Sequence, residues 1–126
     1  MTHSPKTIAA NATVELVQKV LSDFGVRHLP VQRGGELVGV VSERNVREGL
    51  MSSMGRALSV EDVMTPAPYV VPPETPLDEV VAAMAEEKYG SAIIQEEGKV
   101  VGIFTTVDAC RALRQVLANR NENGGI

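Results

Sequence analysis

The chain is an internal duplication, because its second half repeats the pattern of its first half at an interval of about 63 residues. A shift by that interval places Met1-Thr2 over Met64-Thr65 and Gly39 over Gly102, and it needs no gap. The same register aligns polar and apolar positions near the end of each copy: Ser42 with Thr105, Asn45 with Asp108, and Leu50 with Leu113. Glycines and apolar residues stay in phase throughout, so the chain is expected to fold as two copies of one unit.

Each copy predicts the order strand, helix, strand, strand, helix, which is an α+β unit. In the first copy these elements are expected at 7–8, from 14, at 28–31, at 37–41 and from 42. In the second copy they are expected at 69–71, from 77, at 91–94, at 100–104 and from 105. We assign residues 1–57 to the first repeat, with a flexible connector at 52–56, and 58–126 to the second, with a frayed polar tail from Asn119.

Composition and the absence of several motifs exclude whole classes of function. A net charge of -4, 3% aromatic residues and no tryptophan argue against a nucleic-acid partner. Two histidines and one cysteine do not supply a zinc site, so no metal is expected. No apolar stretch is long enough for membrane insertion, and the start of the chain does not resemble a secretory signal, so we expect a cytoplasmic protein. Phosphate-loop, nucleophile-elbow and dinucleotide-binding motifs are absent, which favours a protein that is not an enzyme.

The order of these pieces resembles the CBS domain family, in which two repeats form a Bateman module. The segments that carry the resemblance are Met64-Thr65-Pro66, 25–31, 37–45 and 100–108. The resemblance implies two repeats packed through their sheets with pseudo-twofold symmetry and two clefts between them. It also implies a regulatory role, in which an adenine nucleotide such as AMP, ADP or ATP, or S-adenosylmethionine or a dinucleotide, binds in a cleft, with no catalytic cofactor.

The resemblance also implies two ligand sites of unequal strength. In one site Thr105 and Asp108 would hold the ribose, and Arg27 and His28 of the other copy would reach the phosphate. The second site would use Ser42 and Asn45, and since an amide brings no charge and one acceptor oxygen, we expect it to bind more weakly. The residues expected beside the adenine are Val70, Val71, Ala92 and Ile93 in the first site, and Ile8, Leu29 and Pro30 in the second.

The same polar residues have a purely structural explanation. A helix N-terminus attracts anions, and a carboxylate accepts strong hydrogen bonds from a diol, which supports ligand binding. However, Ser42 with Asn45 and Thr105 with Asp108 also have the spacing of a helix capping box. Spacing alone leaves both roles open. Cys110, one turn into the last helix, is expected to be a small buried residue.

Two functional hypotheses follow from the sequence. The first is an energy-sensing regulatory module that binds an adenine nucleotide and signals through the geometry of a dimer, or of an enzyme or transporter partner. The alternative is a structural dimerisation module that binds no small molecule. A homodimer is expected in both cases, because the helices carry many apolar residues: Val14, Val17, Leu21, Val80, Val81 and Met84.

Overall fold

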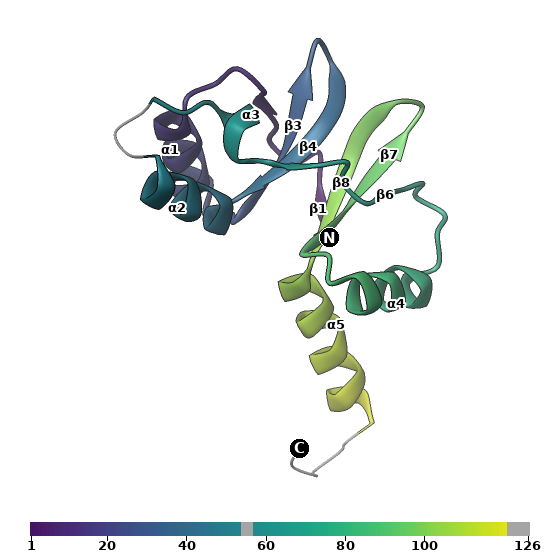
Figure 1. Cartoon of the computed structure of the whole chain (residues 1–126). Helices are drawn as coiled ribbons and strands as arrows, with labels where there is room; N and C mark the ends of the chain where they lie inside the picture. Colours follow the sequence, from purple (N-terminus) through teal and green to yellow (C-terminus); the bar gives the residue numbers. More distant parts are fainter. Residues whose placement is uncertain (54–56, 121–126) are drawn as a thin grey trace.

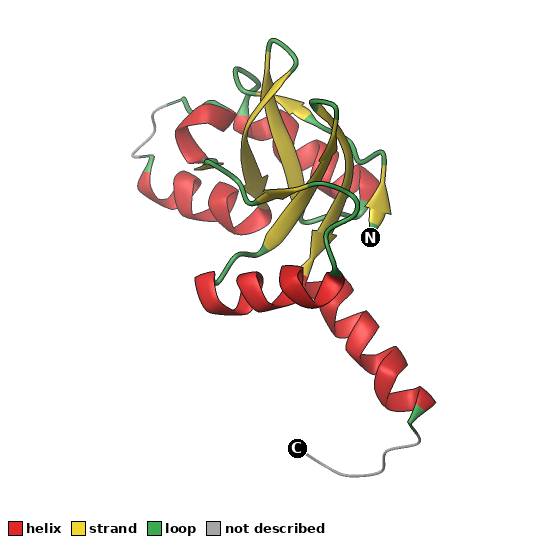
Figure 2. Ribbon diagram, turned by 90° about the vertical axis from the view of Figure 1, so that its right-hand side faces the viewer, coloured by secondary structure: helices red, strands yellow, loops and turns green. Residues whose placement is uncertain are grey.

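The computed structural model, which describes residues 1–53 and 57–120, confirms an α+β fold made of two similar units. The strands gather in the middle of the molecule and the helices lie around them (Figures 1 and 2). The first unit contains β2 (Ile8–Ala9), α1 (Val14–Phe24), β3 (His28–Arg33), β4 (Glu36–Ser42) and α2 (Glu43–Ser52). The second contains β6 (Val70–Val71), α4 (Leu77–Glu87), β7 (Ser91–Glu96), β8 (Lys99–Thr105) and α5 (Thr106–Asn119).

Three short elements were not predicted, and two of them exchange between the units. These elements are β1 (Thr2–His3), α3 (Val60–Val63) and β5 (Thr65–Pro66). β1 pairs antiparallel with β8 of the second unit, and β5 pairs antiparallel with β4 of the first. The two sheets therefore have the orders β1-β8-β7-β6 and β2-β3-β4-β5, and each is completed by the strand that opens the other repeat.

The two segments that we expected to be flexible are only partly among the described residues. Of the expected connector, Ser52 is the last residue of α2 and Ser53 caps that helix, while residues 54–56 lie outside the described residues. Of the expected tail, Asn119 still belongs to α5, and residues 121–126 lie outside the described residues. Within the part of the chain that the structure describes, no helix combines the length and the apolar character needed to cross a bilayer.

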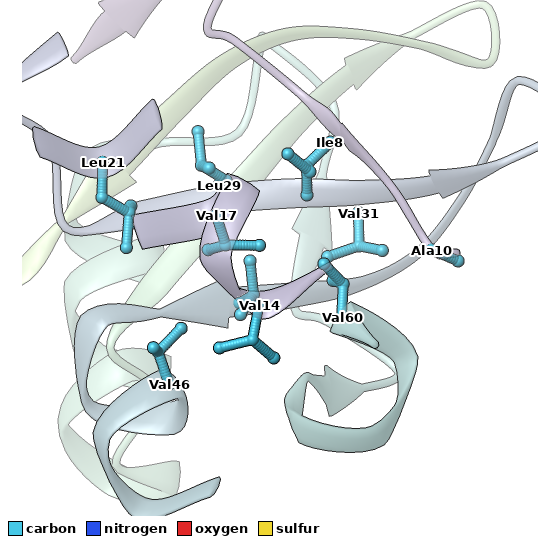
Figure 3. Close-up of a cluster of buried hydrophobic side chains, with 10 residues drawn as sticks. Ile8, Ala10, Val14, Val17, Leu21, Leu29, Val31, Val46 and Val60 are labelled. Carbon is cyan, nitrogen blue, oxygen red and sulfur yellow. The ribbon is translucent and has the colours of Figure 1, made fainter. Parts of the chain in front are cut away.

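The helix that opens each unit packs its apolar stripe on the sheet of that unit. α1 begins at Thr13, whose hydroxyl accepts a hydrogen bond from the Leu16 amide at 3.1 Å, and ends at Gly25 in the left-handed conformation. Figure 3 shows the resulting core, in which side chains of α1 meet those of β3 and α2. A smaller cluster contains Val40 of the first sheet and Ile93 and Ile103 of the second, and it joins the two units.

The apolar helix residues from which we expected a dimer are not available on the surface. Val14, Val17, Leu21, Val80 and Met84 are all buried, and Val81 is half-buried. The apolar stripes of α1 and α4 pack in the cores of the two units, as the apolar face of an amphipathic helix usually does. The reason given for a homodimer was therefore wrong.

Helix α5 behaves differently from the other long helices. It projects away from the sheets (Figure 1), and none of its residues is buried. Cys110 is exposed rather than buried, because the helix leaves the core after its first turn. The apolar side chains left on its surface are Val107, Leu113, Val116 and Leu117.

The close approach of β5 to β4 gives a first prediction. A Cβ added at Gly39 would lie 2.6 Å from Met64 Sδ and 2.8 Å from the backbone oxygen of Thr65. Gly39→Ala is therefore expected to lower the free energy of unfolding by about 1–3 kcal/mol, measured by urea denaturation. The control is Gly102→Ala at the equivalent position of β8, where the nearest backbone atom, the Thr2 oxygen, is farther away at 3.3 Å and Met1 Sδ lies at 2.9 Å. Equal losses in the two variants would contradict a tight crossing at β5.

His28 gives a second prediction, because it lies between the two units. A Cβ on Gly90 of the second unit would lie 3.3 Å from His28 Nε2, so the imidazole packs closely there. Burial, and then the charge of Arg27, lower the pKa of His28 below its usual 6.5. The unfolded chain then binds this proton more readily, so the contribution to stability is present above pH 6.5 and is lost as the pH falls through the folded pKa.

Urea denaturation between pH 8 and pH 5 gives the free energy of unfolding at each pH. The contribution of His28 is the part of its pH dependence that is absent in His28→Gln. The variant should lose less stability on acidification than the unmodified protein. An identical slope in the two proteins would show that His28 takes up its proton equally well folded and unfolded.

Candidate functional site

Both polar pairs form capping boxes at the starts of α2 and α5. The Ser42 hydroxyl accepts from the Asn45 amide at 3.0 Å, and Asn45 Oδ1 accepts from the Ser42 amide at 2.9 Å. The Thr105 hydroxyl accepts from the Asp108 amide at 3.3 Å, and Asp108 Oδ2 accepts from the Thr105 amide at 2.9 Å. The structural explanation of these residues is thus correct, and any ligand role is additional to it.

Capping occupies only one of the two carboxylate oxygens of Asp108. Oδ2 takes the Thr105 amide and also lies 3.2 Å from the Thr105 hydroxyl. Among the described residues, Oδ1 makes only ion pairs: it lies 3.7 Å from Arg111 Nη1 and 3.9 Å from the nitrogen of Met1. Oδ1 therefore remains free to accept a hydrogen bond from a bound molecule, in an environment supplied with positive charge.

A cleft of about 600 Å³ lies beside Asp108, between the two units. The second unit contributes Ile103, Thr105, Val107, Asp108 and Arg111, and the first contributes residues 24–29 between α1 and β3. The structure thus brings Thr105 and Asp108 together with Arg27 and His28, the combination that the resemblance implied. A space of this size is within the usual range for small-molecule sites. We call it the Asp108 cleft.

A second cleft of about 680 Å³ lies beside Asn45. Its wall again draws on both units, with Ser42, Asn45 and Arg44 at the start of α2 and Tyr89, Gly90 and Ser91 before β7. The rings of Tyr69 and Tyr89 are stacked with centroids 4.9 Å apart, and both residues line this cleft. Arg27 and His28 belong to its wall as well as to that of the Asp108 cleft. We call it the Asn45 cleft.

The residues expected beside the adenine do not line the clefts to which they were assigned. Ala92 and Ile93 have no exposed surface, and Val70 is absent from the wall of the Asp108 cleft. Val71 does meet Asp108, but in a separate hollow of about 650 Å³ beside α4 and α5. Leu29, assigned to the other site, lines the Asp108 cleft, while Ile8 and Pro30 are buried and absent from the wall of the Asn45 cleft.

The exchanged strands explain this mismatch. Because β1 and β5 cross between the sheets, the helix start of one unit faces the turn that precedes the central hairpin of the other unit. The prediction took the phosphate contacts from the other copy but the adenine wall from the same copy as the helix start, whereas each cleft sets the helix start against the segment before the hairpin of the other copy. The polar residues expected at the Asp108 cleft therefore lie together, whereas the apolar residues expected beside the adenine do not line that cleft.

Sequence reasoning missed several residues of the cleft walls. Lys6 and Phe24 line the Asp108 cleft, where the Lys6 ammonium lies 4.8 Å from the centre of the Phe24 ring. Lys6 and Tyr69 occupy equivalent positions of the repeat, and both line a cleft. Their equivalent positions could have been found from the repeat. However, one is a lysine and the other a tyrosine, and the residues around them do not indicate a function.

Both clefts carry an excess of positive charge in a chain whose net charge is -4. In the Asn45 cleft the acids are already engaged: Glu43 pairs with Arg47 at 3.2 Å and Arg27 at 3.8 Å, and Glu48 pairs with Arg44 at 2.9 Å. Lys88 adds a further cation to that wall. Local positive charge of this kind attracts small anions. Among the described residues, no cluster of three or more His, Cys, Asp or Glu side chains could hold a metal ion.

Comparisons with known proteins agree with this arrangement. The family model described as CBS domain matches the chain twice, at residues 1–52 and 60–115. An inosine-5'-monophosphate dehydrogenase of Korarchaeum cryptofilum is 30% identical over 119 residues, which are 94% of this chain and 24% of that enzyme. The chain thus spans about a quarter of the length of this curated relative.

Solved structures show the same fold. The CBS domain pair of protein MJ0100, solved in complex with 5'-methylthioadenosine and S-adenosyl-L-methionine, superposes with a TM-score of 0.81 at 23% identity, covering 91% of this chain and 93% of that one. CBSX2, solved in complex with AMP, is 28% identical, with a TM-score of 0.74 and coverage of 92% and 93%. With two repeats, two exchanged strands and two clefts between the units, the chain belongs to the CBS domain family as a tandem pair.

Proposed function

We propose that the chain is a regulatory module that binds an adenine nucleotide such as AMP or ATP in the Asp108 cleft. The observation that carries this proposal is that the two carboxylate oxygens of Asp108 differ in their contacts. Oδ2 caps α5, and Oδ1 can accept a hydrogen bond from a ligand. A carboxylate oxygen is a strong acceptor for ribose hydroxyls. The binding of AMP by CBSX2, a relative at 28% identity, supports the same ligand class.

The charges around Asp108 suit a phosphorylated ligand. Arg27 reaches the cleft from the first unit and Arg111 from α5, so a nucleotide held by its ribose has guanidinium groups near its phosphate. The N-terminus of α5 adds partial positive charge to the same cleft. The apolar wall of Leu29, Ile103 and Val107 offers a surface for the base. The ligand would carry the energy state of the cytoplasm to an enzyme or a transporter partner.

We further propose that the module forms a homodimer through α5. The exposed apolar residues of this helix, Leu113, Val116 and Leu117, follow the three- and four-residue spacing of a single helix face. Their exposed fractions of 58%, 49% and 41% leave this face without cover in the monomer. A second copy related by twofold symmetry would cover it with an identical face.

The alternative is a structural module, and the two complete capping boxes favour it, since they explain Ser42, Asn45, Thr105 and Asp108 without any ligand. The two proposals differ in whether adenosine compounds bind. They agree on the dimer, so the tests of ligand and of assembly are separate.

Ligand binding predicts a rise in melting temperature. A compound present at a hundred times its dissociation constant stabilises the folded protein by about 2.7 kcal/mol, which in a domain of this size raises the melting temperature by several degrees. Differential scanning fluorimetry with adenosine, AMP, ATP and S-adenosylmethionine measures the shift. If none of them at millimolar concentration moves the transition, the structural module is the better description.

Asp108→Asn separates the ligand role from capping, because the amide oxygen still accepts from the Thr105 amide. The variant should bind AMP about ten- to a hundredfold more weakly by isothermal titration calorimetry, since a charged acceptor is lost. Asn45→Ala, in the other cleft, serves as the control and should leave this affinity unchanged. Unaltered AMP binding in Asp108→Asn would place the nucleotide elsewhere.

The dimer is tested by sedimentation velocity. Leu113→Glu introduces a charge into the exposed face of α5 and is expected to shift the protein from dimer to monomer at about 100 µM. Leu50→Glu is the matched control, because Leu50 is the equivalent residue of the first repeat and is also exposed. A monomeric unmodified protein, or loss of the dimer in both variants, would argue against assembly through α5.

A further inference from the structure

The two clefts present opposite hydrogen-bonding groups at equivalent positions. Asn45 and Asp108 occupy the same place in the repeat and cap their helices in the same way, each with one side-chain oxygen. After capping, Asp108 is left with a second oxygen, which accepts. Asn45 is left with its Nδ2 amide, which donates. No hydrogen bond from Nδ2 is found among the described residues, and Asn45 lines its cleft.

The orientation of the Asn45 amide is determined by its partner. The Ser42 backbone N–H lies 2.9 Å from Oδ1 and can only donate, so the oxygen must face it and the nitrogen must face away. The exchange of Asp for Asn therefore does more than remove a charge. It replaces an acceptor for hydroxyl groups with a donor for oxyanions.

Neighbouring residues change in the same direction. Arg44 stands in α2 where Val107 stands in α5, and both residues line their clefts. The side chain of Arg44 is 80% exposed, and its ion pair with Glu48 lies on the surface, where such pairs are weak. The Asn45 cleft thus offers an amide donor and a guanidinium where the Asp108 cleft offers a carboxylate and an apolar side chain.

We propose that the Asn45 cleft binds a nucleotide that carries a phosphate on its ribose ring, in place of the free diol accepted by the Asp108 cleft. The ring phosphate would accept from Asn45 Nδ2 and from Arg44, beside the partial positive charge at the start of α2. The stacked pair of Tyr69 and Tyr89 supplies an aromatic wall for the base. This inference rests on the proposed function, because it takes the ribose position of the Asp108 cleft as its reference.

The test is a titration followed by ¹H–¹⁵N spectroscopy with three probes: adenosine, adenosine 5'-phosphate and adenosine 3'-phosphate. The side-chain amide of Asn45 gives its own signals, which are assigned by their loss in Asn45→Asp. The 3'-phosphate is expected to shift these signals and those of Tyr89, with an affinity at least about tenfold higher than that of adenosine. In Asn45→Asp the signals of Tyr89 should instead report tighter binding of adenosine than of adenosine 3'-phosphate.

A second pair of variants tests the role of Arg44 without altering the capping box. Arg44→Val introduces the residue found at the equivalent position of α5 and should weaken adenosine 3'-phosphate about tenfold at the Asn45 cleft. Lys19→Val is the matched control, since Lys19 also forms an exposed i,i+4 ion pair on a helix but lines neither cleft. Equal affinities in the two variants would remove Arg44 from the site.

The same spectra separate this inference from the proposed function. Signals of Asp108 and Arg111 report binding at the Asp108 cleft. If adenosine 5'-phosphate moves them while the Asn45 amide prefers adenosine, or responds to no probe, the inference is overturned and the proposed function stands. If none of the probes moves either set of signals, both are overturned.

Discussion

The exchange of the opening strands is the constraint on which the rest of the structure depends. Because β1 completes the sheet of the second unit and β5 that of the first, neither sheet is whole without the other repeat. Gly39 and Gly102 permit the close crossings, where a side chain would meet Met64 or Met1. The crossings place each helix start opposite the hairpin of the other unit, and the two clefts between the units are a consequence of this arrangement.

At each helix start, one residue does two tasks with different atoms. Helix capping needs a single acceptor oxygen, which both Asn45 and Asp108 supply. The other polar atom of the side chain, Oδ1 of Asp108 or Nδ2 of Asn45, is not used by the cap and belongs to a residue that lines a cleft. A structural role and a binding role are thus compatible at one residue, and under the proposed function the choice between Asp and Asn would set the chemistry of the cleft.

Much of this structure is predictable from the sequence because it is local. The repeat gives the two units, apolar spacing gives the helices, and the pairs Ser42–Asn45 and Thr105–Asp108 give the caps. The positions of Ala92 and Ile93 were less predictable, because Ala92 is buried in the core of its own unit and Ile93 in the cluster that joins the units, and neither lines a cleft. Cys110 was misplaced for a similar reason, since amphipathic spacing does not tell whether a helix stays on its sheet.

Arg27 and His28 form part of the wall of both clefts. Two anions bound in the two clefts would therefore share the Arg27 guanidinium, and the first to bind would reduce the attraction available to the second. Linkage makes this penalty reciprocal, so each ligand weakens the other by the same factor. Under the proposed function, this shared cation would couple the two clefts, so the occupancy of each would depend on the concentrations of both ligands.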